Sequence, residues 1–140
     1  MGAWGFGNFE NDAARDWLYD FSENDFRLID RTLAGVADMI AADYLDAEEA
    51  CEVLAAAECV AAEAGYPPIN PPEELAEWLT ENSPIQVKPA YVEMAQKAVA
   101  RVLTQSELRD LWLESGEYRG WETAVSDLQT RLNNIAPSEE

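Results

Sequence analysis

The sequence predicts an all-α fold: a compact single-domain bundle of about seven short helices, with an extended Gly/aromatic N-terminal segment. Apolar residues recur at spacings of three and four, the period of an amphipathic helix, and no stretch sustains the alternation of a strand. Residues typical of helix ends separate these stretches. We expect one domain over residues 1–136 and a frayed acidic tail at residues 137–140.

The first two expected helices each begin at a residue that favours an N-cap. Asn11 or Asp12 precedes a helix of about ten residues. Ser22 opens a second helix that reaches about Ala42. Gly35 in its interior costs about 1 kcal/mol relative to alanine, so we expect a close crossing with another helix there.

The third expected helix is the best candidate for the centre of the bundle. Asp46 begins it, Gly65 ends it, and its inner face is rich in alanine, which allows neighbouring helices to approach closely. Its outer face carries four acidic residues: Glu48, Glu49, Glu52 and Glu63.

Four more helices are expected after a proline-rich loop, over residues 71–82, 89–103, 105–115 and 118–132. Thr104 and Glu107 fit a capping box at the start of the sixth helix, and Gly116 ends that helix. Core positions are expected for the tryptophans on apolar stripes, Trp17, Trp78, Trp112 and Trp121. Trp4 lies off any stripe and either clamps the N-terminal segment or belongs to a contact surface.

The two cysteines indicate a reducing compartment. Cys51 and Cys59 lie eight residues apart in one expected helix, about 12 Å, which is too far for a disulfide. Cys51 is expected in the core, whereas Cys59 points further outward and could be reactive. No apolar run is long enough for a membrane-spanning helix and no signal peptide is recognisable, so we expect a cytoplasmic protein with no membrane contact.

The acidic charge is concentrated in the middle of the chain. The net charge is −19, and residues 32–87 hold twelve Asp and Glu but no Lys or Arg. Such a field repels nucleic acid and attracts basic proteins or cations. The alternatives are a merely solubilising surface, or neutralisation by cations of the C-terminal helices: Lys97, Arg101, Arg109, Arg119 and Arg131.

Motifs for catalysis and cofactor binding are absent. The chain has no histidine, which excludes Ser-His-Asp triads and histidine-ligated zinc, and two cysteines cannot form a Cys-only zinc site. We therefore expect no cofactor, no metal site and no catalytic residue. Carboxylates one helical turn apart, such as Glu48 and Glu52, leave open a carboxylate-based divalent-metal-binding or hydrolytic protein.

The opening residues also carry a family resemblance. Met1-Gly-Ala-Trp-Gly-x-Gly-x-Phe-x-Asn-Asp-x-Ala-x-Asp-Trp17 resembles the start of the uncharacterised bacterial family called domain of unknown function 4259 (DUF4259). Further matches are Tyr44-Leu45-Asp46, the run 55–62, Leu111-Trp112 and Trp121, whereas Phe6 stands where a smaller residue is expected. The resemblance spans nearly the whole chain. It implies a small stand-alone helical protein and brings no activity or site residue.

The leading hypothesis is a small acidic protein that binds a basic partner protein, in an immunity-like or regulatory role. An acidic mimic of nucleic acid is a sharper version of this hypothesis. Asp12, Asp16 and Asp20 are spaced to share one helix face, opposite the apolar one. The residues expected to meet the partner are Trp4, Asp12, Asp16, Asp20, Glu48 and Glu52.

Overall fold

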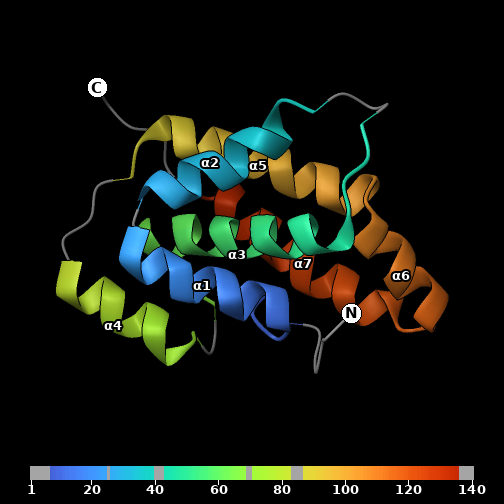
Figure 1. Ribbon diagram of the computed structural model, residues 1–140, viewed down its shortest axis with the longest axis horizontal. Helices are drawn as coiled ribbons and strands as arrows, with labels where there is room; N and C mark the ends of the chain where they lie inside the picture. Colours follow the sequence, from blue (N-terminus) through green and yellow to red (C-terminus); the bar gives the residue numbers. More distant parts are fainter. Residues whose placement is uncertain (1–6, 25, 40–42, 69–70, 83–86, 136–140) are drawn as a thin grey trace.

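The fold is known from a computed structural model that describes residues 7–24, 26–39, 43–68, 71–82 and 87–135. These residues form seven helices and no strand, which confirms the predicted all-α fold (Figure 1). The helices are α1 (Asp12–Asn24), α2 (Phe26–Ala37), α3 (Ala47–Glu63), α4 (Glu73–Asn82), α5 (Pro89–Thr104), α6 (Glu107–Ser115) and α7 (Tyr118–Asn133). Trp4 and the expected tail lie outside the described residues.

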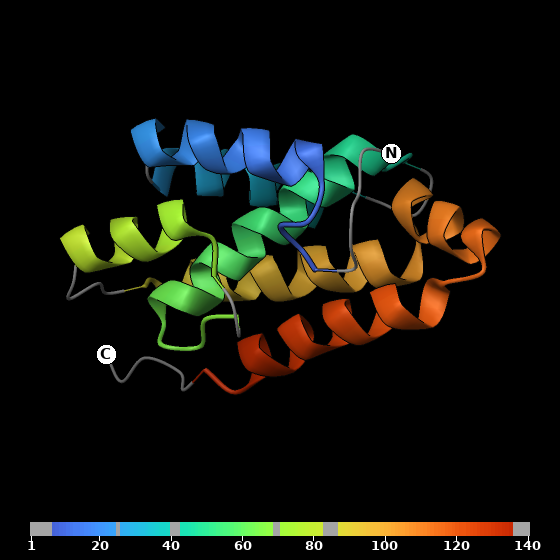
Figure 2. The same ribbon diagram turned by 90° about the horizontal axis from the view of Figure 1, so that it is seen from below.

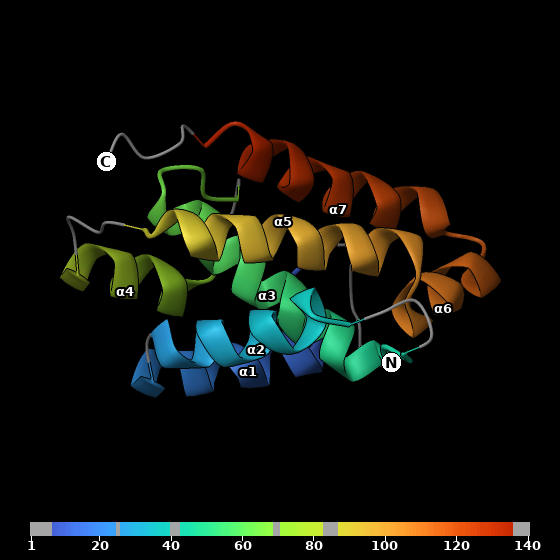
Figure 3. The same cartoon turned by 90° about the horizontal axis from the view of Figure 1, so that it is seen from above.

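Helix α3 is the centre of the bundle, as predicted. It contacts each of the other six helices and crosses between α1 and α2 on one side and α5 and α7 on the other (Figures 2 and 3). Apart from Glu52, every residue from Ala50 to Glu63 is buried. The many alanines permit this enclosure, because a small side chain lets a neighbouring backbone come close.

The enclosure of α3 corrects two expectations. Cys59 was expected to point outward, but its exposure is 0%. Burial raises the pKa of the Cys59 thiol well above its usual value and that of Cys51 to about 12. Neither cysteine is therefore a reactive thiolate. Glu63 was placed on the outer face, but it is buried, at 6% exposure.

The helix ends follow local chemistry at most positions. The Asn11 side chain accepts a hydrogen bond from the Ala14 N–H, and Asp46 accepts one from Glu49 N–H, so both residues are N-caps. Gly65 and Gly116 have positive φ angles of 100° and 85° directly after α3 and α6.

Four details of the expected helices were wrong. Ser22 does not open the second helix, because it lies within α1 and α2 begins at Phe26. Ser106, not Thr104, caps α6 by accepting the Arg109 N–H, and the Glu107 carboxylate instead accepts the Ala47 N–H at the start of α3. Helix α2 ends at Ala37, short of position 42, and α1 has 13 residues rather than about ten.

Gly35 does not mark a close helix crossing. It is exposed, and a Cβ atom added to it would meet nothing within 4 Å. The glycine is therefore not required by packing.

Aromatic side chains join the outer helices to the core. The four tryptophans expected in the core are all buried, each at most 9% exposed. Trp17 of α1 stacks on Phe21, whose ring in turn contacts Trp78 of α4 at 4.8 Å between centroids. The Trp17 indole N–H donates to the Thr32 hydroxyl at 2.9 Å, which links α1 to α2.

Candidate functional site

An acidic groove lies between the first turns of α1, α3 and α6. Its volume is about 390 Å³, and carboxylates from all three helices line it: Asp12, Asp16, Glu48 and Glu107. Ala13, Ala47 and Leu111 add apolar surface. The structure thus brings together three of the six residues that the sequence singled out.

A second hollow lies between α1, α2 and α3. It has a volume of about 330 Å³ and includes Asp20, Glu49 and Glu52, with Trp17 and Arg31 in its wall. The remaining predicted carboxylates, Asp20 and Glu52, therefore belong to this second hollow. We call Asp12, Asp16, Asp20, Glu48, Glu49, Glu52 and Glu107 the acidic surface.

Crowding of like charges perturbs titration on the acidic surface. Burial raises the pKa of Glu52, and the charges of Glu48 and Glu49 raise it further, with Asp46 and Asp20 adding to the shift. Burial, followed by the charge of Asp46, likewise raises the pKa of Glu49. A cation placed here would relieve this repulsion.

Four of the chain's cations pair with carboxylates outside the acidic groove. Lys97 pairs with Glu93, Arg109 with Asp110 and Arg15 with Glu74. Arg131 of the C-terminal helices pairs with Glu58, a carboxylate in the acidic middle of the chain, as the neutralisation alternative expects of such cations. Over the described ranges, no ion pair joins Lys or Arg to the groove carboxylates Asp12, Asp16 and Glu48.

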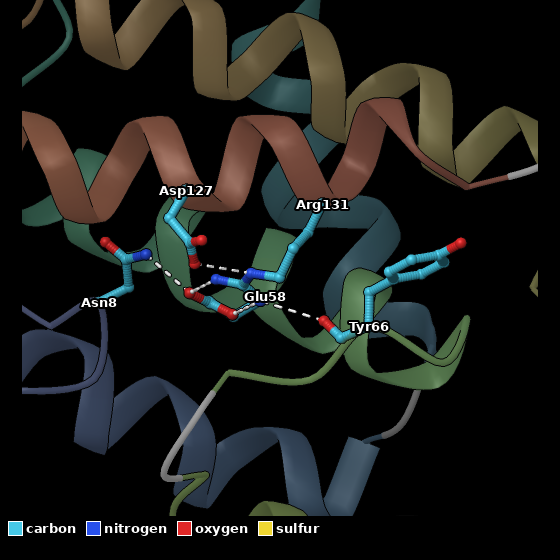
Figure 4. Close-up of polar contacts among 5 residues, drawn as sticks. All are labelled: Asn8, Glu58, Tyr66, Asp127 and Arg131. Carbon is cyan, nitrogen blue, oxygen red and sulfur yellow. Dashed lines mark hydrogen bonds and ion pairs between the residues drawn. The ribbon is translucent and has the colours of Figure 1, made fainter.

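Glu58 and Arg131 form a buried ion pair between α3 and α7 (Figure 4). Nη1 and Nη2 of Arg131 each donate to one Glu58 oxygen at 2.8 Å, which is a bidentate pair. Arg131 also donates from Nε to Asp127 at 2.9 Å and from Nη1 to the Tyr66 carbonyl at 3.1 Å. Asn8 Nδ2 donates to Glu58 Oε2 at 2.7 Å, which joins the segment before α1 to the cluster.

The surroundings of this pair favour the charged form of Arg131. Burial alone would lower the pKa of Arg131, but hydrogen bonds and the negative charges of Glu58 and Asp127 outweigh it and raise that pKa. The Glu58 side chain is only 3% exposed and the Arg131 side chain 14%. The pair is therefore an enclosed link between α3 and α7.

A polar cavity of about 380 Å³ adjoins the pair. It lies between the entry to α1, the loop after α3 and the second half of α7. Charged and polar side chains form much of its wall: Asn8, Glu10, Arg15, Glu58, Asp127 and Arg131. Phe9, Pro68 and Pro72 add apolar surface.

Comparison with known proteins gives a family and no activity. The family model described as "Domain of unknown function (DUF4259)" matches residues 2–124. The chain belongs to the DUF4259 family. Neither a curated protein nor a solved structure matches it.

The DUF4259 match includes the whole acidic surface and Glu58, and it ends before Asp127 and Arg131. Sequence reasoning missed Glu58, although one signal was available. Glu58 is the one charged residue in the apolar run at positions 53–62 of the helix expected at the centre. A charge there must be paired, and the family resemblance itself gave no partner for it.

Two features are absent from the described part of this DUF4259 fold. In the ranges that the structure describes, no three Asp, Glu or Cys side chains are placed to hold a metal ion. Among the same residues, no helix is both long enough and apolar enough to cross a membrane.

Proposed function

We propose that this protein binds a basic partner protein through its acidic surface, in an immunity-like or regulatory role. The observation that supports the proposal most directly is the acidic groove. Carboxylates from three separate helices meet there, and the described part of the chain supplies no cation to Asp12, Asp16 or Glu48.

The groove suits a lysine or arginine side chain from the partner. Its charged head would meet Asp12, Asp16 and Glu48, and its aliphatic stem would lie against Ala47 and Leu111. A net charge of −19 would speed encounter with a basic surface and make the encounter sensitive to salt. The proposal includes a cytoplasmic location. It also includes no direct binding of nucleic acid, because the negative charge of the protein repels phosphates.

Two variants with the same net charge test the proposal. The groove variant carries Asp12→Asn, Asp16→Asn and Glu48→Gln. The control carries Glu73→Gln, Glu77→Gln and Glu81→Gln, three exposed carboxylates of α4. Each protein is immobilised, exposed to cell lysate at low salt and eluted with rising salt. We expect the native protein and the control to retain the same basic protein, and the groove variant to lose it.

Other outcomes would contradict partner binding at the groove. Equal loss from both variants would mean that bulk charge alone causes retention. If the retained protein is a nucleic-acid-binding protein that added DNA releases, the acidic surface acts as a mimic of nucleic acid. A melting temperature that rises with micromolar Ca²⁺ or Mn²⁺ would instead favour the carboxylate-metal alternative, because a ligand bound only to the folded state stabilises it.

A further inference from the structure

The polar cavity beside Glu58 and Arg131 is separate from the acidic surface. The two share no lining residue. At about 380 Å³ the cavity falls in the usual range for small-molecule sites, about 300–1,000 Å³. Binding of a basic partner protein at the acidic surface would therefore leave this cavity without a ligand.

The wall of this cavity is held rigidly. Four of the five N–H groups of Arg131 are engaged by Glu58, Asp127 and the Tyr66 carbonyl. Glu58 fixes the orientation of the Asn8 amide. An ionised carboxylate can only accept hydrogen bonds, so the Nδ2 of Asn8, and not its Oδ1, must face Glu58. Asn8 is 7% exposed, and its Oδ1 has no hydrogen-bond partner, which is costly for a buried acceptor.

Arg15 supplies positive charge at the cavity. It donates to both oxygens of Glu74 through Nη2 alone, so Nε and Nη1 remain for another acceptor. Its side chain is 39% exposed. A guanidinium in this state suits a ligand carboxylate, to which Nε or Nη1 can donate a charge-assisted hydrogen bond.

Acceptors for a cationic group lie in the same wall. Glu10 uses Oε1 to accept the Gly7 N–H, and Asp127 uses Oδ2 to accept from Arg131, so each keeps a second oxygen. A primary ammonium group carries three donors and matches such carboxylate acceptors. Phe9, Pro68 and Pro72 offer an apolar surface for the rest of a ligand.

From these groups we infer that the cavity binds a free amino acid with an apolar side chain. The ligand carboxylate pairs with Arg15, the ammonium group with Glu10 and Asp127, and the side chain lies against Phe9 and the prolines. The cavity offers a cationic group, anionic groups and an apolar wall. A free amino acid can use all three, whereas a simple anion or cation cannot.

The test is a chemical-shift titration of the full chain with L-leucine and two analogues that each lack one charge. Leucinamide has no carboxylate, and N-acetyl-L-leucine has no ammonium group. We expect L-leucine to shift the amide signals of cavity residues, with Kd weakened about tenfold or more for either analogue. Arg15→Gln should weaken L-leucine to a similar degree and leave leucinamide unchanged. Asp127→Asn should weaken L-leucine and leave N-acetyl-L-leucine unchanged.

The matched controls are Arg119→Gln and Glu114→Gln, both exposed and outside the cavity wall. They should bind L-leucine like the native protein. The absence of shifts in cavity residues at millimolar L-leucine would overturn the inference. So would equal weakening by the cavity variants and the controls, because that result would mean that only overall charge matters.

Discussion

At the scale of single residues, Glu58 is the position whose structural role is hardest to predict from the local sequence. It lies in an alanine-rich stretch that the sequence assigns correctly to the centre of the fold. A carboxylate is tolerated there because Arg131 supplies a bidentate partner from 73 residues further along the chain. Helix periodicity is local in sequence and cannot reveal such a partner, so the pair could not be predicted from spacing.

Removing one partner of this pair should lower the free energy of unfolding more than removing both partners. Arg131→Met leaves Glu58 charged and buried without compensation, so we expect the free energy of unfolding to fall by about 3–5 kcal/mol. Adding Glu58→Leu removes the buried charge and should restore much of that loss. Urea unfolding at neutral pH measures both effects.

Asp127→Asn is the control for this cycle. Asp127 also contacts Arg131, but its side chain is 63% exposed, so its replacement should cost less than about 1 kcal/mol. If the double variant is no more stable than Arg131→Met, the loss comes from packing around Arg131 rather than from an isolated charge on Glu58.

At the scale of elements, the sequence predicts helices well where the chemistry is local. Asp46, Gly65 and Gly116 act at the ends of the helices that they were expected to bound. The capping box at Thr104 was wrong because Glu107 has a tertiary alternative, the Ala47 N–H on α3. Glu107 both begins α6 and joins it to α3, and a four-residue pattern contains no information about that second role.

Gly35 leads to a prediction about α2. The helix continues through this exposed glycine, and a Cβ atom there would meet nothing within 4 Å. Gly35→Ala should therefore stabilise the protein by about 0.5–1 kcal/mol, because alanine loses less backbone entropy on forming a helix. The midpoint of urea unfolding should rise with an unchanged m-value.

A matched substitution separates helix propensity from other effects of the added methyl group. Gly116→Ala places alanine at a φ of 85°, where it is strained, so this variant should be less stable than the native protein. A destabilised Gly35→Ala variant would contradict the open space around position 35 and restore the expectation of a close contact.

At the scale of the whole molecule, the sequence predicts the fold class, the central helix and the buried tryptophans. These features follow from the apolar periodicity of the sequence, because each helix of the bundle buries its apolar face. It predicts the candidate site only in part. The stripe of Asp12, Asp16 and Asp20 shares a helix face, but the structure divides these residues between two hollows, because α3 and α6 complete the groove at Asp12 and Asp16, whereas α2 and α3 complete the hollow at Asp20. Sequence spacing within one helix does not determine which neighbour completes a groove.

Charge crowding over the molecule leads to a prediction about pH. Glu49, Glu52 and Glu77 all have raised pKa values in the folded protein. A carboxyl with a raised folded-state pKa binds protons more readily in the folded state. Its contribution to stability is therefore present below the unfolded value, near 4.5, and is lost as pH rises through the folded value.

Glu52→Gln should isolate this effect. At a pH of about 3.5 the variant and the native protein should be similarly stable, and at pH 7 the variant should have the larger free energy of unfolding. Salt at about 1 M should reduce the difference in part, because it screens the repulsion from Glu48 and Glu49 but does not change burial. Glu114→Gln, at an exposed position of α6, is the matched control for the loss of one negative charge. If the Glu52→Gln variant is less stable than the native protein at pH 7, the Glu52 charge is compensated within the fold. There would then be no repulsion at Glu52 for a basic partner to relieve.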